Sequence, residues 1–168
     1  GALPLPEASK DAAMLIDLTA GSYTALVDAV PGRGRVAIAE VYSVSHDASG
    51  DARLVNLSTR AVVGTGEEIL IPGFVAAGDL PRRILLRAVG PTLRADLGDA
   101  ALADPVLRVY TGESGRLVAE NDDWHTSPTA DIVREIADRV GAFALDEDGR
   151  DAALVLTVSP VTEYTIRV

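Results

Sequence analysis

The chain has 168 residues and a formal net charge of −10, from 25 acidic and 15 basic side chains, and this acidity argues against nucleic acid as a partner because it would repel phosphate backbones. Hydrophobic residues make up 48% of the sequence, which is enough to build a core and excludes intrinsic disorder. Cysteine is absent, so disulfide frameworks, thiolate metal sites and cysteine nucleophiles are excluded, and no apolar run reaches the roughly 20 residues of a membrane span.

Short β-branched runs bounded by turn residues dominate the sequence and predict strands. In chain order the predicted strands are 12–18, 23–29, 35–44, 53–57, 68–74, 82–89, 106–110, 116–120, 152–158 and 163–168. In the last of them the alternation is clear, because Tyr164 and Ile166 point one way and Thr165 and Arg167 point the other.

Two segments interrupt the strand pattern. Residues 90–98 predict one or two helical turns, and residues 128–140 predict a helix that Ser127 caps and Gly141 ends. Its predicted apolar stripe consists of Ile132, Val133, Ile136 and Val140. The predicted fold class is all-β: a jelly-roll-like antiparallel β-sandwich with about ten strands and one or two short surface helices.

The two ends of the chain repeat each other. Residues 1–20 align without a gap on residues 141–160, from a shared Gly-Ala start to the match of Asp11-Ala12-Ala13 with Asp151-Ala152-Ala153. One inserted residue later, Tyr23-Thr24 matches Tyr164-Thr165. This order predicts a true repeat with a period of about 140 residues.

The repeat predicts two parts: residues 1–48 are the C-terminal strands of a preceding unit, and residues 52–168 are the main β-sandwich unit. The second part lacks a counterpart of one strand of the first, the assembly strand, which contains Val36, Ile38, Glu40, Val41 and Tyr42. An unfilled strand position exposes unpaired backbone. The assembly strand is expected to fill it, either within the chain or in a neighbouring copy, and the second case gives a head-to-tail polymer.

Three consecutive oxygen-bearing side chains, Asn121, Asp122 and Asp123, follow a predicted strand. A loop that turns them toward one point would offer ligands for calcium, a hard cation. The other interpretation is an Asx-turn, in which Asn121 and Asp122 bond to the backbone of the loop. The acidic group at residues 146–149 is interpreted as a solvated turn, because its counterpart in the first copy retains only Glu7.

Little in the sequence predicts catalysis. His125 could meet Asp122 or Asp123, but the chain has no Gly-x-Ser-x-Gly nucleophile elbow. Trp124 would stack on a sugar if it were exposed, and would otherwise plug one end of the sandwich. We therefore expect a protein that is not an enzyme.

Three motifs resemble bacterial pre-peptidase C-terminal domains. They are Asp-Pro-Val-Leu-Arg-Val-Tyr at residues 104–110, Gly-Arg-Leu-Val-Ala-Glu-Asn-Asp-Asp at 115–123 and Tyr-Thr-Ile-Arg-Val at 164–168. The resemblance covers residues 104–168 and implies a secreted jelly-roll-like sandwich that accompanies exported enzymes and surface proteins. Some pre-peptidase-like domains bind calcium, which adds weight to the calcium interpretation of Asn121, Asp122 and Asp123.

A wider resemblance covers nearly the whole chain. Residues 54–60, 63–66, 71–74 and 86–93 are similar to tandem repeats in large exported proteins of verrucomicrobial and related bacteria. Those repeats also carry an Asn-Asp-Asp-Trp run and a closing strand like Glu40-Val41-Tyr42. The resemblance implies a location outside the cell or on the surface of a bacterium.

The expected function is that of a non-catalytic extracellular structural module, which polymerises head to tail with other copies of itself by β-strand complementation into a fibre or surface array. The alternative is an accessory module of an exported enzyme that binds carbohydrate or cell wall. Aromatic residues make up only 4% of the chain, which is few for a sugar-binding platform.

Overall fold

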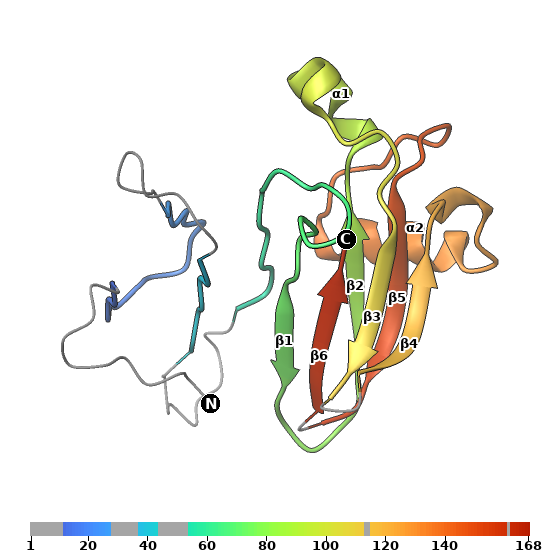
Figure 1. Cartoon of the computed structure of the whole chain (residues 1–168). Coiled ribbons are helices and arrows are strands. Elements are labelled where there is room, and N and C mark those ends of the chain that lie inside the picture. Colours follow the sequence, from blue (N-terminus) through green and yellow to red (C-terminus); the bar gives the residue numbers. More distant parts are fainter. Residues whose placement is uncertain (1–11, 28–36, 44–53, 113–114, 161) are drawn as a thin grey trace. The chain divides into compact units, whose positions relative to one another are not determined.

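A computed structural model of this protein contains two antiparallel sheets (Figure 1). The structure describes residues 12–27, 37–43, 54–112, 115–160 and 162–168. The chain divides into two compact units, residues 1–59 and residues 60–168. The described residues of the first unit form no helix or strand, so every element below belongs to the second unit.

Six strands and a few short helices make up the second unit. The strands are β1 (Gly73–Ala76), β2 (Arg82–Ala88), β3 (Leu107–Thr111), β4 (Arg116–Asn121), β5 (Ala152–Val158) and β6 (Thr162–Arg167). The helical elements are η1 (Pro91–Leu93), α1 (Arg94–Leu97), η2 (Gly98–Ala100), η3 (Trp124–Thr126) and α2 (Ala130–Val140).

One sheet has four strands in the order β1-β6-β3-β4, and the other has two, β2 and β5. Every pairing is antiparallel. In the two-stranded sheet Leu86 lies opposite Leu154, and in the four-stranded sheet Val109 lies opposite Ile166. Two backbone bonds between Leu70 and Val168 extend the ladder of β1 and β6 beyond the ends of the strands.

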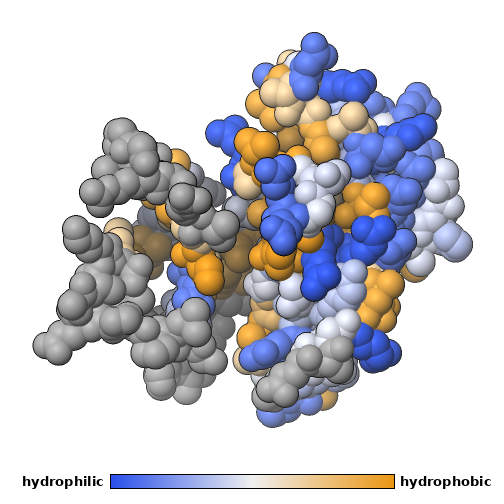
Figure 2. Space-filling view, in the orientation of Figure 1, coloured by the Kyte–Doolittle hydropathy of each residue, from blue (hydrophilic) through white to orange (hydrophobic). Residues whose placement is uncertain are grey.

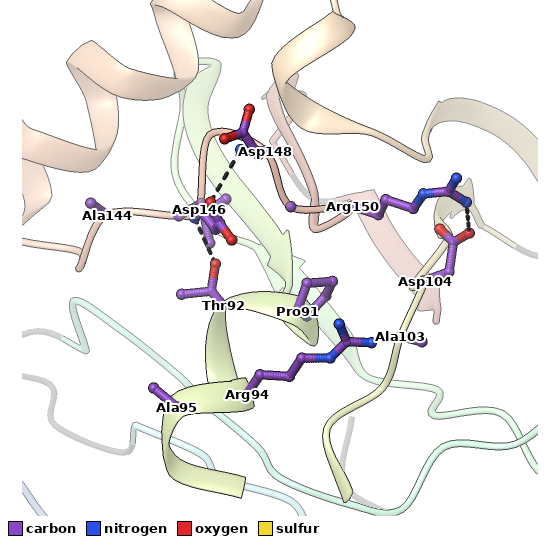
Figure 3. Close-up of a pocket in the computed structure, with 12 residues that line it drawn as sticks. Pro91, Thr92, Arg94, Ala95, Ala103, Asp104, Ala144, Asp146, Asp148 and Arg150 are labelled. Atoms are coloured by element: carbon purple, nitrogen blue, oxygen red, sulfur yellow. Dashed lines mark hydrogen bonds and ion pairs between the residues drawn. The ribbon is translucent and has the colours of Figure 1, made fainter. Parts of the chain in front are cut away.

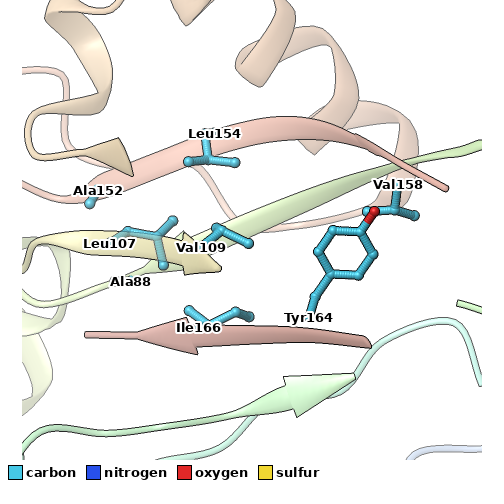
Figure 4. Close-up of a cluster of buried hydrophobic side chains, with 8 residues drawn as sticks. All are labelled: Ala88, Leu107, Val109, Ala152, Leu154, Val158, Tyr164 and Ile166. Carbon is cyan, nitrogen blue, oxygen red and sulfur yellow. The ribbon is translucent and has the colours of Figure 1, made fainter. Parts of the chain in front are cut away.

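The main core contains side chains from both sheets (Figure 4). Its buried members are Ala88, Leu107, Val109, Ala152, Leu154, Val158, Tyr164 and Ile166. Tyr164 also stacks on Phe74 of β1, with ring centroids 5.1 Å apart. Alternate residues of β6 point into this core, while Arg167 is exposed, so the alternation predicted for this strand is confirmed.

A second, smaller core covers the other face of the two-stranded sheet. Trp124, Ala130 and Val133 pack there against Ala153, with Leu85 and Val155 at its margin. The first part of β5 is therefore covered on both faces, which explains its run of five apolar residues at 152–156. The helix in this layer ends at Gly141, whose φ of 70° places it in the left-handed region that favours glycine at this position.

The structure confirms an all-β fold but differs from the prediction in detail. It has six strands among the described residues instead of about ten. The described parts of segments 12–18, 23–29, 35–44 and 53–57 form no strand and are exposed. A strand forms only where a partner satisfies its backbone hydrogen bonds, and the described residues provide none for these segments.

The predicted helix is also shorter than expected. It begins at Ala130, after Thr129 as N-cap, and not next to Ser127. The Ser127 hydroxyl instead accepts a bond from the Thr129 backbone N–H at 3.3 Å, within the turn that precedes the helix. Of the predicted stripe, Val133 and Ile136 are buried, while the other two members remain at the surface.

Candidate functional site

A fully buried carboxylate joins the end of β2 to the start of β5, at one end of the two-stranded sheet. Asp151 precedes β5 and has no exposed surface. One of its oxygens accepts the Gly90 backbone N–H at 2.7 Å, and the other accepts the Thr92 hydroxyl at 2.5 Å and the Thr92 backbone N–H at 3.2 Å. Bonds to an ionised acceptor are stronger than those between neutral groups. Asp151 therefore fixes the turn after β2 against the start of β5.

The Thr92 hydroxyl extends this network to a third segment. It accepts the backbone N–H of Asp146 at 2.7 Å, so that the loop after α2 is held on the same turn. Gly90 leaves no room for a side chain, because a Cβ there would lie 2.2 Å from the Leu102 carbonyl oxygen. The Gly-Pro-Thr motif at residues 90–92 thus works as the partner of Asp151.

Beside this network lies a cleft of about 730 Å³ (Figure 3). Its polar lining is mixed in charge: Arg94 comes from α1, while Asp146, Asp148 and Arg150 come from the loop before β5. Arg150 pairs with Asp104 at 2.7 Å, and this carboxylate raises the pKa of the Arg150 guanidinium. The cleft is therefore lined by charges of both signs, of which Arg150 and Asp104 form an ion pair.

The three acidic residues at positions 146–148 are exposed, in line with the interpretation of this loop as a solvated turn, while Gly149 behind them is buried. The Asp146 carboxylate accepts the Asp148 backbone N–H at 3.1 Å, which closes a local Asx turn. Glu147 pairs with Arg134 of α2 at 2.5 Å, and this hydrogen bond lowers the pKa of the Glu147 carboxyl. These contacts shape the loop and attach it to the helix.

The three predicted calcium ligands have different surroundings. The Asn121 side-chain oxygen accepts the backbone N–H of Ala153 at 2.8 Å, and its amide donates to the Asp123 carbonyl at 3.3 Å. Asp122 is exposed, while one carboxylate oxygen of Asp123 is buried without a hydrogen-bond partner. Asn121 bonds to the backbone, as in the alternative interpretation, but its acceptor bond reaches across to β5 instead of staying within the loop.

Within the described ranges, no group of three or more histidine, cysteine, aspartate or glutamate side chains is arranged to hold a metal ion. His125 could have met Asp122 or Asp123, but no hydrogen bond or ion pair joins these described residues, and the His125 Nδ1 is buried without a hydrogen-bond partner. The ring instead lies edge-on to Trp124, with centroids 6.4 Å apart.

Trp124 is 2% exposed, so it packs in the smaller core and has no free face for a sugar. Its ring N–H donates to the Asp146 carbonyl at 3.2 Å, and its backbone N–H donates to the Asp151 carbonyl at 2.9 Å. Arg134 covers one side of the ring, with its guanidinium carbon 4.8 Å from the centroid.

The assembly strand lies in the first unit, where its described residues are exposed. Figure 2 shows exposed hydrophobic side chains lying among hydrophilic ones on the visible face. The exposed fractions are 72% for Ile38, 64% for Val41 and 51% for Tyr42. The Tyr42 hydroxyl donates to the Glu40 carboxylate at 2.9 Å, and this bond raises the pKa of the tyrosine. Val36 lies outside the described residues.

Sequence reasoning missed the role of Asp151. The signal was present, because an aspartate directly before a run of apolar residues is costly to bury unless its charge has dedicated donors. Those donors lie about sixty residues earlier along the chain, in the Gly-Pro-Thr turn.

The comparisons with known proteins found no match: no family model, no curated protein and no solved structure resembles this chain closely enough to be assigned. Over the described part of the chain, no helix is long and apolar enough to cross a membrane.

We predict that Asp151→Ala lowers the free energy of unfolding by about 2–5 kcal/mol, because it leaves buried backbone donors without an acceptor. Chemical denaturation followed by Trp124 fluorescence measures this loss. Asp148→Ala is the matched control, since that carboxylate is exposed and its removal should cost less than about 0.5 kcal/mol. Equal losses in the two variants would contradict the role given to Asp151.

Asn121→Ala is expected to cost about 1–3 kcal/mol, because the Ala153 N–H would lose its acceptor in a part-buried position. The same measurement with Asp122→Ala should show little change. Both variants are measured in EDTA and in calcium. A loss of unfolding free energy that appears only in calcium would instead identify Asn121 as a metal ligand. No loss in either EDTA or calcium would contradict the structural role given to its bond with Ala153.

Proposed function

We propose that this protein is a non-catalytic structural module that assembles with other copies of itself by β-strand complementation. The observation that carries the proposal is the assembly strand: an apolar, strand-patterned segment that is exposed and pairs with no described residue. A protein normally protects such a segment, because bare backbone and apolar side chains promote pairing with other chains.

The pattern of the assembly strand suits an added strand. Ile38, Glu40 and Tyr42 share one face, as the bond between the last two side chains illustrates. Ala39 and Val41 share the other face. In strand addition the backbone hydrogen bonds supply affinity, and alternate side chains enter pockets on the partner.

The second unit offers edges for such a strand. One of its sheets has only two strands, and on the described residues β2 pairs only with β5. Ile84 and Leu86 of β2 are only partly buried although they pack against the main core. A further strand beside β2 would cover them and would bring the number of strands closer to that of a jelly-roll-like β-sandwich.

The proposed setting is the outside or the surface of a bacterial cell, in a fibre or array built from repeated units. The repeat between the chain ends and the resemblance to exported tandem repeats support this setting. The burial of Trp124 takes away the aromatic side chain that most favoured a carbohydrate-binding module. Calcium remains a proposal for the loop at residues 121–123, which the EDTA comparison above tests.

The proposal predicts self-association that grows with protein concentration, measured by sedimentation velocity and seen as filaments in electron micrographs. Replacing Ile38 and Val41 with aspartate should raise the concentration needed for assembly by about tenfold or more, because each buried apolar contact is exchanged for a charge.

The matched control replaces Val62 and Leu80 with aspartate, because these residues are at least as exposed (98% and 76%) but lie outside the assembly strand. The control should assemble like the unsubstituted chain. A chain that stays monomeric at the highest concentrations would overturn the proposal. Equal assembly of the Ile38/Val41 variant and the control would overturn the role of this strand.

A further inference from the structure

Residues 12–27 repeat the sequence of the hairpin β5–β6, but their surroundings are the opposite of those of the hairpin. Leu154 is 7% exposed and its counterpart Met14 is 83% exposed. Tyr164 is 6% exposed and its counterpart Tyr23 is 57% exposed. The same apolar sequence pattern is thus buried in β5–β6 and exposed in residues 12–27.

The turn of the hairpin shows a matching contact in both copies. In β5–β6 the Tyr164 hydroxyl accepts the Ser159 backbone N–H at 2.9 Å. In the first copy the hydroxyl of Tyr23 donates to the carbonyl of Thr19, the residue aligned with Ser159, also at 2.9 Å. The tyrosine therefore bonds to the backbone of the same turn position in both copies, although the first has no sheet around it.

The pairing register of β2 shows how well residues 12–18 would fit the position of β5. Leu86, Leu85 and Ile84 face Leu154, Val155 and Leu156, and the counterparts of those three residues are Met14, Leu15 and Ile16. All are apolar and of similar size, which cores tolerate well. Arg83 faces Thr157, whose counterpart is Asp17, so the exchange would add an opposite charge across the pair.

The register between β3 and β6 indicates which of the two sequences, β5–β6 or residues 12–27, fits this position better. Arg108 faces Arg167, and the counterpart Leu26 would remove this like-charge pair. Against that gain, Val109 faces the buried Ile166, whose counterpart is Ala25. Replacing a buried isoleucine with alanine costs more free energy than the removal of a surface like-charge pair gains. The resident hairpin therefore keeps its own position, and residues 12–27 remain free.

We infer that residues 12–27 are a docking hairpin, and that their partner is a second copy of the fold of residues 60–168 whose own β5–β6 position is vacant. The inference rests on the proposed function in that copies of one chain assemble, but it assigns a different segment and a different receiving surface. That surface is the one that β5 and β6 cover in Figure 4: β2 on one side and β3 with β1 on the other.

The test mixes two full-length chains. The acceptor carries Ala153→Arg and Leu154→Asp, which place charges in both cores where the exposed fractions are 0% and 7%, together with Ala13→Arg to disable its own docking hairpin. The donor is the unsubstituted chain. Sizing chromatography should show a 1:1 complex in which the acceptor regains protection from amide exchange.

The matched control donor carries Ala13→Arg alone. Ala13 is exposed, so this donor should be as stable as the unsubstituted chain, while the yield of complex should fall by about tenfold or more. The inference would be overturned if the unsubstituted donor neither formed a complex with the acceptor nor restored its protection from amide exchange. Equal complex formation with both donors would also overturn it.

A disulfide reports the register in a chain that has no cysteine of its own. Asp17→Cys in the donor and Arg83→Cys in the acceptor should crosslink on oxidation, while Ser22→Cys in the donor should not. Equal crosslinking by the two donors would overturn the register, and with it the match to β5. Substitution of Ile38 and Val41 should leave this crosslink unchanged, so failure of the docking hairpin and failure of the assembly strand are distinguishable.

Discussion

The structure depends on one buried charge. Asp151 has no contact with water, and its carboxylate would destabilise the core if its donors were missing. The turn at residues 90–92 provides those donors and so fixes where β2 ends and β5 begins. Correct pairing of these two strands in turn places Leu154 in the main core and Ala153 against Trp124. The hydrogen bonds of one side chain thus set the register of a sheet that has only two strands.

The same dependence explains why the described residues of the first unit form no strand. It contains the Asp-Ala-Ala sequence of β5 and the tyrosine of β6, but no described residue offers a counterpart of the Gly-Pro-Thr turn or of β2. Apolar pattern alone does not form a sheet, because backbone groups must also be satisfied. Residues 12–27 and 37–43 are therefore strand sequences without a sheet, and we propose that other copies of the fold provide it.

The sequence predicted the elements whose neighbours along the chain complete them. Strands β3 and β4, the helix α2 and the alternation of β6 follow from local period and turn residues. It failed where partners are distant: the donors of Asp151 lie about sixty residues away, and the unpaired strands of the first unit look no different in sequence from paired ones. Asn121 was ambiguous for another reason, since an oxygen that could bind calcium could equally accept a backbone N–H.

Amide hydrogen exchange at a series of protein concentrations tests the central claim most directly, because it reports on the backbone of the bare segments themselves. If other copies provide the missing sheet, amides in residues 37–43 exchange rapidly in dilute solution and become protected as the concentration rises, while β2 and β5 are protected throughout. Rapid exchange in residues 37–43 at every concentration, in a protein whose sheets remain intact, would contradict the account.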